Sequence, residues 1–187
     1  MSDTFQLQPI GRVEAGDEGF AIVIDEPYRD ALTGLEGFSH INVLWWFHLL
    51  DSPEYRAVMV AEKPYRDAPD RLGIFATRSP VRPNPLALTP VPLISIDLEH
   101  GRVAIPFIDA EPGTPVLDIK PYNPAVDRIR EVGVPEWCAG WPEWYEDSAT
   151  FDWGAVFENA QERRKGRTGM PMSMTSASSR WASRPMT

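Results

Sequence analysis

The first half of the chain is dominated by short apolar runs with a period of two, not by helical repeats. Six segments rich in β-branched or aromatic residues are predicted to be strands: Phe5–Val13, Phe20–Ile24, Ile41–Leu50, Gly73–Thr77, Leu93–Leu98 and Arg102–Ile108. The dipeptide His100-Gly101 between the last two is typical of a hairpin turn. Strands this short, separated by proline and glycine, predict a mainly β fold, either a barrel or a sandwich.

Helical patterns are few and short, and nineteen prolines work against long helices. Pro124–Val132 is predicted to form two turns with a proline at the first helical position. Trp153–Arg164 has the strongest helical pattern, with Asp152 as its N-cap. The chain is therefore expected to divide into a β domain over residues 1–145, a C-terminal helix over 146–165 and a disordered basic tail over 166–187.

Composition narrows the class of protein. Cys138 is the sole cysteine, which excludes a disulfide framework and a cysteine-based zinc cluster, and three scattered histidines do not indicate a metal site. Met1–Gln8 shows no signal-peptide pattern, and Ile41–Leu50 is too short to cross a bilayer. These features predict a cytoplasmic protein without metal and without membrane contact.

Charge is distributed unevenly along the chain. Six of the 18 basic residues and none of the 27 acidic ones lie after residue 162. The 12 basic and 27 acidic residues before that point give residues 1–162 a net charge of −15. Because such a body repels a polyanion over most of its surface, any binding of nucleic acid requires a local basic patch or the tail.

The segment Gly73–Leu88 joins a short apolar run to a proline-rich loop. Its prolines restrict the backbone that carries Arg78 and Arg82, and a preorganised arginine suits a carboxylate or phosphate. Both arginines belong to a basic island over Lys63–Arg82. A proline-rich edge connection with solvated arginines explains the same pattern about as well.

The segment Asp109–Tyr122 contains a second set of polar residues. In an extended chain, Asp118, Lys120 and Tyr122 share one face. A carboxylate, an ammonium and a phenol on one face can handle protons, but a structural ion pair is the more common explanation. His48, at the end of an apolar run, is by itself more typical of a core histidine than of a ligand.

Five strings of residues together resemble the TsaA-like family of tRNA threonylcarbamoyladenosine N6-methyltransferases. They fall in the family's order over about residues 5–130 and are Pro9-Ile-Gly11, Gly37-Phe-Ser-His40, Gly73-Ile-Phe-Ala-Thr-Arg-Ser-Pro80, Arg82-Pro-Asn-Pro85 and Gly113-Thr-Pro-Val-Leu-Asp-Ile-Lys-Pro-Tyr122. The resemblance implies a small β-barrel that binds S-adenosyl-L-methionine, forms a homodimer and uses no metal.

The resemblance also implies site residues, carried over position by position. The cofactor-binding residues would be His48, Leu49, Arg78, Leu88, Phe107, Ile108 and Asp109. Arg82 and Asn84 would bind the substrate. Asp118 is the candidate general base, with Lys120 and Tyr122 orienting the substrate. The implied reaction is N6-methylation of threonylcarbamoyladenosine beside the anticodon of tRNA, which the Lys63–Arg82 island and the basic tail would contact.

Two departures from the family pattern keep other functions open. Pro112 stands where the family commonly has an aspartate, and Ala15–Gly19 is acidic where the family often has a segment of the Pro-Arg-Gln type. A methyltransferase of a small-molecule acceptor and a non-catalytic S-adenosylmethionine-binding module are the two alternatives.

Overall fold

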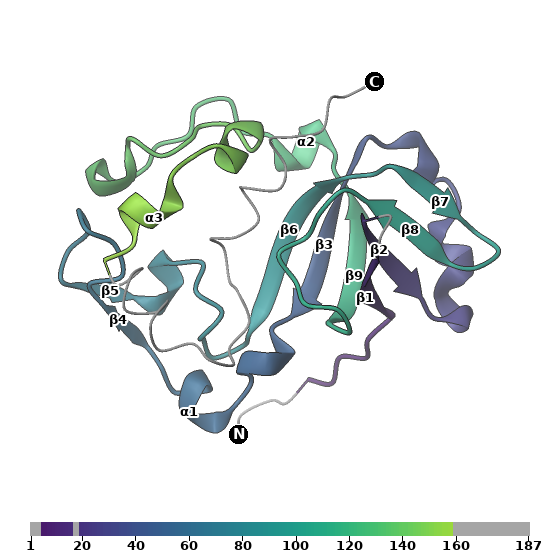
Figure 1. Ribbon diagram of the computed structural model, residues 1–187, viewed down its shortest axis with the longest axis horizontal. Helices are drawn as coiled ribbons and strands as arrows, with labels where there is room; N and C mark the ends of the chain where they lie inside the picture. The colour runs from purple at the N-terminus through teal and green to yellow at the C-terminus, as the bar shows by residue number, and fades with distance from the viewer. Residues whose placement is uncertain (1–4, 17–18, 159–187) are drawn as a thin grey trace. The chain divides into compact units, whose positions relative to one another are not determined.

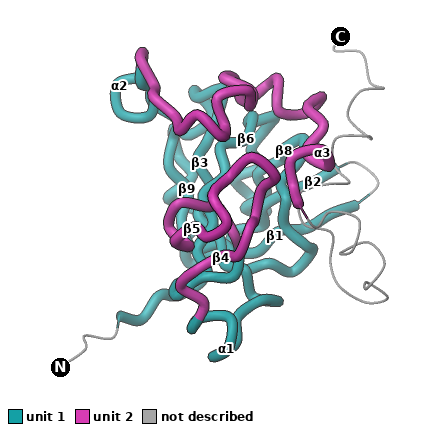
Figure 2. The backbone as a smooth tube through the Cα atoms, turned by 90° about the vertical axis from the view of Figure 1, so that its left-hand side faces the viewer, with its two compact units in different colours: residues 1–57, 80–129 teal, residues 58–79, 130–187 magenta. Residues whose placement is uncertain are grey.

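The computed structural model describes residues 5–16 and 19–158, and the predicted tail over 166–187 lies outside the described residues. The chain forms two compact units, each built from two separate stretches of sequence (Figure 2). The first unit comprises residues 1–57 and 80–129, and the second comprises residues 58–79 and 130–187. The three-part division predicted from the sequence stays a prediction.

A seven-stranded antiparallel sheet forms the first unit (Figure 1). Its strands are β1 (Gly11–Gly16), β2 (Gly19–Ile24), β3 (His40–Trp46), β6 (Leu86–Pro92), β7 (Ser95–Asp97), β8 (Arg102–Ile105) and β9 (Pro115–Pro121). They lie in the order β6-β3-β9-β1-β2-β8-β7. The mainly β prediction is confirmed. The sheet is not closed into a barrel, since β6 and β7 are its two edges within the described residues.

The core lies against one face of this sheet and consists of β-branched side chains at alternate positions. Nine of them are at most 1% exposed: Val13, Ile22, Ile24, Ile41, Val43, Val91, Val103, Ile105 and Val116. Branched side chains pack well on a pleated surface, and burying each one stabilises the fold by about 1.5–3 kcal/mol. The alternation seen in the sequence therefore selects the buried face of each strand.

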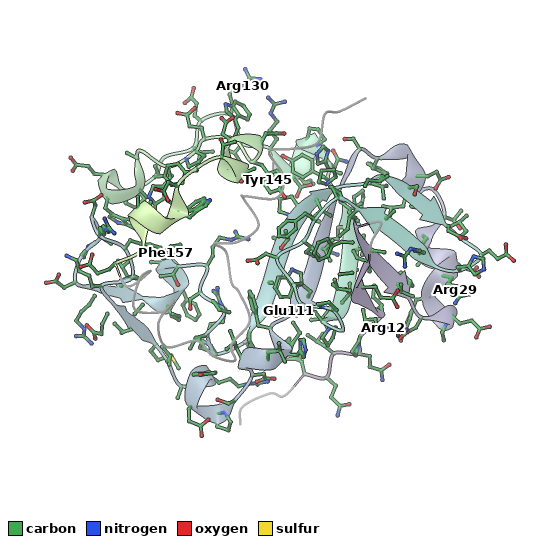
Figure 3. All side chains as sticks on the ribbon, viewed as in Figure 1. Arg12, Arg29, Glu111, Arg130, Tyr145 and Phe157 are labelled. Atoms are coloured by element: carbon green, nitrogen blue, oxygen red, sulfur yellow. The ribbon has the colours of Figure 1, made fainter. Side chains whose placement is uncertain are left out.

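The predicted turn at His100-Gly101 is confirmed as the connection of the β7–β8 hairpin. Gly101 has φ +65°, and its carbonyl accepts a hydrogen bond from the amide of Ile24 at 2.8 Å, so this position requires glycine. Arg29 packs against the same turn (Figure 3) and donates from Nη1 to the carbonyl of Glu99 at 2.7 Å.

Four predicted strands differ in extent from the observed ones by more than one residue. The strand predicted over Phe5–Val13 begins only at Gly11. The strand predicted over Ile41–Leu50 ends at Trp46 and is followed by a 3-10 turn, η3 (His48–Leu50). The strand predicted over Leu93–Leu98 is confined to β7. The strand predicted over Arg102–Ile108 ends at Ile105.

One predicted strand is wrong, and one strand of the seven-stranded sheet was missed. Gly73–Thr77 holds a 3-10 turn, η4 (Ile74–Ala76), which the hydroxyl of Thr77 closes by donating to the carbonyl of Ile74 at 2.8 Å. The missed strand is β6, which contains Pro90 and Pro92. A proline cannot donate to a central ladder, and β6 tolerates both because it is an edge strand.

Within the described residues α-helix is limited to single turns, as the proline content predicts. The α-helical turns are α1 (Pro53–Arg56), α2 (Pro124–Asp127) and α3 (Trp153–Val156), and the remaining 3-10 segments are η1 (Glu26–Leu32), η2 (Leu35–Gly37), η5 (Glu136–Cys138) and η6 (Glu146–Ala149). Asp152 caps α3 as predicted, accepting from the amide of Ala155 at 3.3 Å. The helices predicted over Pro124–Val132 and Trp153–Arg164 are each one turn long within the described residues.

The second unit contains the hairpin of β4 (Val60–Glu62) and β5 (Arg71–Gly73) and an aromatic cluster. The ring of Tyr65 stacks on Trp137, with centroids 5.4 Å apart, and meets Trp141 edge-on at 4.9 Å. Trp153 and Phe157 extend the cluster. Burial in this cluster raises the pKa of the Tyr65 hydroxyl.

Candidate functional site

The face of β3, β6 and β9 opposite the core carries several of the predicted site residues. Leu44, at the centre of β3, pairs with Leu88 of β6 on one side and with Asp118 of β9 on the other. Neighbouring strands are about 4.8 Å apart, so Leu88 and Asp118 lie two strand spacings, roughly 10 Å, from each other. A predicted cofactor residue and the candidate base therefore share one exposed face.

A β-bulge in β9 determines how Asp118 is presented. Val116 pairs with Trp45 and Asp118 pairs with Leu44, which leaves Leu117 as an extra residue in β9. Val116 is fully buried, and Ile119 packs against the same core. Because two residues rather than one separate these core positions, Leu117 and Asp118 both lie on the side away from the core.

Asp118 and Lys120 form an ion pair on this face. Lys120 Nζ lies 2.7 Å from Asp118 Oδ2, and the amide of Ile119 donates to Oδ1 at 2.9 Å. The hydrogen bond and the charge of Asp118 raise the pKa of the Lys120 ammonium. The ion pair that the sequence favoured is present, and it fixes the carboxylate at both oxygens. The catalytic roles of the two residues stay a prediction.

Tyr122 follows Asp118 and Lys120 in the sequence and lies just beyond the end of β9. Its amide donates to the carbonyl of His40 at 3.0 Å, and its ring meets the His40 ring edge-on with centroids 6.3 Å apart. The turn that follows is tied to β3, because Asn42 Nδ2 donates to Asp127 Oδ1 at 3.0 Å. The amide of Asn123 donates to the other oxygen of Asp127 at 2.7 Å.

An open pocket of about 730 Å³ lies within the first unit, at the end of this face where β3 finishes. It is lined by Phe5, Leu7, Pro9, Trp46, Arg56, Asn84, Leu86, Pro115 and Leu117. Trp46 and Leu86 are paired residues of β3 and β6, so their side chains project from the same face. Of the predicted substrate residues, Asn84 lines this pocket.

A three-residue network holds one wall of the pocket. Asp51 Oδ2 accepts from Trp46 Nε1 at 2.8 Å and from Arg56 Nη2 at 2.9 Å. The Arg56 guanidinium also lies over the Trp46 ring, 5.4 Å from its centroid. The hydrogen bond from Arg56, reinforced by the one from Trp46, lowers the pKa of the Asp51 carboxyl despite partial burial.

The other cofactor-binding candidates of the first unit lie on two separate segments. His48 and Leu49 begin η3, directly after β3, and Leu49 is 54% exposed. Phe107, Ile108 and Asp109 follow β8, which β9, β1 and β2 separate from β3 in the sheet. The side chain of Ile108 is buried in the core, so only its main chain can face a ligand.

Arg78 belongs to the second unit and Arg82 to the first, so the Lys63–Arg82 island is divided between them. Within the second unit, Thr77 Oγ1 accepts from the amide of Ser79 at 3.2 Å and stiffens the turn that carries Arg78. Lys63 pairs with Asp70 at 3.3 Å and Arg71 pairs with Glu62 at 3.1 Å. The charges of Lys63 and Arg71 are thus offset by carboxylates.

The described residues form neither a metal-binding cluster nor a membrane-spanning helix. Residues 5–16 and 19–158 contain no group of three or more histidine, cysteine, aspartate or glutamate side chains arranged to hold a metal ion. In the same part of the chain, no helix has the length and apolar character needed to span a membrane.

Sequence reasoning missed most of the pocket. Phe5, Leu7 and Pro9 alternate with polar residues, and this alternation was interpreted as part of a strand. Arg56 belongs to no motif that could be recognised in the sequence. These residues come together with Asn84 only in the folded chain, so the sequence offers no signal that could have found the pocket.

The family of the protein follows from its sequence. The chain belongs to the family of the tRNA-methyltransferase O N-terminal domain, which matches residues 6–128. The matched region contains both Gly73–Leu88 and Asp109–Tyr122, and it confirms the resemblance found from the motifs.

Named relatives divide into two groups. A probable S-adenosyl-L-methionine-binding protein of Pyrococcus horikoshii is 33% identical over 129 residues, which cover 69% of this chain and 90% of that protein. The tRNA (adenine(37)-N6)-methyltransferase of Escherichia coli is 33% identical over 121 residues, which cover 64% of this chain. The match spans only 51% of the length of the Escherichia coli enzyme.

Solved structures show the same fold. A crystal structure of TrmO superposes with a TM-score of 0.56 at 29% identity, covering 71% of this chain and 64% of that one. TrmO from Pseudomonas aeruginosa gives a TM-score of 0.54 at 29% identity, covering 70% of this chain and 61% of that one.

Proposed function

We propose that this protein is an S-adenosyl-L-methionine-dependent methyltransferase that modifies N6 of an adenosine in tRNA. The observation that carries the proposal is the family match over residues 6–128, which contains both segments singled out for their chemistry. The names of the relatives from Pyrococcus horikoshii and Escherichia coli support the cofactor and the acceptor respectively. The motif resemblance supports a narrower acceptor, threonylcarbamoyladenosine beside the anticodon.

The side chains present are chemically suited to S-adenosylmethionine. Arg78 is an exposed guanidinium that can pair with the carboxylate of the methionine part. Asp109 can accept hydrogen bonds from the ribose hydroxyls or from the amino group. The buried side chain of Ile108 leaves its main chain to contact the adenine edge, as expected if backbone groups recognise that ring.

The cofactor supplies an activated methyl group, so the protein's main contributions are alignment and removal of a proton. Asp118 is the proposed base for the proton on the accepting nitrogen. Lys120 and the amide of Ile119 hold its two oxygens, and a carboxylate has further lone pairs with which to accept a proton. Tyr122, at the end of the same row, would orient the acceptor, as would Arg82 and Asn84.

The resemblance also supports a homodimer located in the cytoplasm, with RNA contacts from the Lys63–Arg82 island and the basic tail. Sedimentation of the purified protein tests the dimer. Binding of tRNA should weaken steeply as salt rises, because each phosphate contact releases counterions. Binding that is insensitive to salt would contradict an electrostatic role for the island.

Two observations favour other functions for this protein. The net charge is −9, and the match spans 90% of a relative named only as a probable S-adenosyl-L-methionine-binding protein but half of the Escherichia coli methyltransferase. These features support transfer of methyl to a small molecule, or binding of S-adenosylmethionine without transfer.

Transfer of labelled methyl from S-adenosylmethionine to bulk tRNA, from cells that lack the corresponding endogenous activity, distinguishes these functions. The proposal expects incorporation that disappears in a folded Arg78→Ala variant. Absence of incorporation, with cofactor binding shown by calorimetry, would overturn the tRNA acceptor. Metabolite extracts would then separate a small-molecule methyltransferase from a binding module.

A further inference from the structure

We propose that the pocket lined by Phe5, Trp46, Arg56, Asn84 and Leu117 binds the base that receives the methyl group. This inference rests on the proposed function, because it assigns a place to the acceptor of that reaction. Three features of the pocket support it: its position beside Asp118, the chemistry of its walls and its volume.

The position of the pocket beside Asp118 follows from the bulge in β9. Leu117 lines the pocket and Asp118 is the next residue, and both lie on the face away from the core. Consecutive Cα atoms are about 3.8 Å apart, so a ring seated against Leu117 lies within reach of the Asp118 carboxylate. Without the bulge, Leu117 and Asp118 would lie on opposite faces of the sheet.

The walls suit a planar heterocycle. Phe5 and Trp46 provide aromatic surface, and base–aromatic stacking is a common means of holding an unpaired base. Asn84 presents an amide with both a donor and an acceptor, which can pair with the polar edge of a base. The ion pair with Asp51 offsets the charge of Arg56, so this wall favours an uncharged ring over a phosphate.

The volume allows more than a bare base. About 730 Å³ lies within the 300–1,000 Å³ typical of small-molecule sites. An adenosine that carries a substituent on N6 can therefore enter with its substituent. The cofactor candidates His48, Leu49 and Leu88 do not line the pocket, whereas the substrate candidate Asn84 does.

Two variants test the pocket without touching the candidate base. Phe5→Ala removes aromatic surface from a side chain that is 85% exposed, and Leu86→Trp fills the pocket from a side chain that is 37% exposed. The control is Ile94→Ala, whose side chain is 63% exposed and does not line the pocket. Each variant is compared with the unmodified protein in methyl transfer to tRNA and in calorimetric binding of S-adenosylmethionine.

The proposal expects Phe5→Ala to raise the KM for tRNA by roughly fivefold to a hundredfold, the effect of a lost stacking contact. Leu86→Trp should raise the same KM because its larger side chain fills the pocket. The affinity for S-adenosylmethionine should stay unchanged, and Ile94→Ala should match the unmodified protein. Weaker cofactor binding in the two pocket variants would assign the pocket to the cofactor and overturn the proposal. An unchanged KM in both variants would also overturn it.

Failure of the proposed function gives a different result. If the unmodified protein transfers no methyl to tRNA, filter binding of the same tRNA still tests the pocket. Weaker binding in Phe5→Ala and Leu86→Trp than in Ile94→Ala would support a base-binding pocket in a protein that is not the proposed methyltransferase. Equal binding by all four proteins, or a change in sedimentation that shows a second copy on this face, would overturn the pocket assignment.

Discussion

Lys120 Nζ lies 2.7 Å from Asp118 Oδ2 on the exposed face of β9, next to the bulge at Leu117. Lys120 holds one carboxylate oxygen while the amide of Ile119 holds the other. In the proposed reaction this arrangement fixes the position of the Asp118 carboxylate beside the accepting nitrogen.

Asp118→Asn should therefore abolish most of the turnover while cofactor affinity stays nearly intact. A positioned general base contributes about 10²–10⁴-fold to rate, and the amide retains the shape of the side chain but cannot take the proton. Single-turnover methyl transfer and calorimetry with S-adenosylmethionine measure the two effects separately. Loss of cofactor binding would instead assign Asp118 to the cofactor site.

Arg78→Ala should weaken the binding of S-adenosylmethionine by about tenfold to a hundredfold, the usual loss for a hydrogen bond to a charged group. The matched control is Arg71→Ala in the same unit. The Arg71 side chain is 69% exposed and pairs with Glu62, so its removal should leave cofactor affinity unchanged. Equal losses in both variants would indicate a general effect of charge rather than a contact made by Arg78.

Gly11→Ala should destabilise the first unit strongly. A Cβ at Gly11 would lie 2.2 Å from the carbonyl oxygen of Val23, so β1 and β2 would have to separate. Overpacking of this kind costs about 1–3 kcal/mol or more. Gly16→Ala, at the other end of the same strand, meets nothing within 4 Å and is the control. Urea unfolding of both variants measures the difference, and equal stabilities would contradict the close approach at Gly11.

Much of the sheet could be predicted from the sequence, because the positions that alternate in apolar character are the ones that become buried. Val103 and Ile105 of β8 show this directly, as does the turn at Gly101. The edge strand β6 could not be predicted, since Pro90 and Pro92 argue against a strand unless its place in the sheet is known.

Only the features of the site that depend on local sequence patterns could be predicted. The period of two placed Asp118 and Lys120 on one face, and the structure joins them in an ion pair. The bulge at Leu117 depends on the pairing of β9 with β3, which is a long-range relationship. The second unit was missed for the same reason, because Tyr65 packs against Trp137 and Trp141 from a distant part of the chain.

Trp141→Ala should loosen the second unit more than the first. Trp141 contacts Tyr65, Trp137 and Trp153 edge-on, and loss of a large aromatic side chain from a packed cluster costs about 3 kcal/mol. Hydrogen exchange at the amide of Arg66, which bonds to the carbonyl of Val156 at 2.9 Å, reports on this unit.

The control for that experiment is Trp144→Ala, because Trp144 is 56% exposed and should cost much less. The amide of Ile22 in the first unit provides an internal reference. Equal acceleration of exchange in both units would show that they unfold together, and it would contradict independent packing of the aromatic cluster.

Asp51→Asn should change the pH dependence of stability in acid. Arg56 lowers the pKa of Asp51 below its ordinary value of 3.8, so the ionised carboxylate stabilises the fold above that pH. The contribution is lost as pH falls through the lower, folded-state pKa. The variant should therefore be less stable than the unmodified protein at neutral pH, by less than about 1 kcal/mol for a partly exposed pair, and equally stable in strong acid. Urea unfolding across the acid range measures this convergence. A stability difference that persists at the lowest pH would show that the substitution acts through something other than the charge of Asp51.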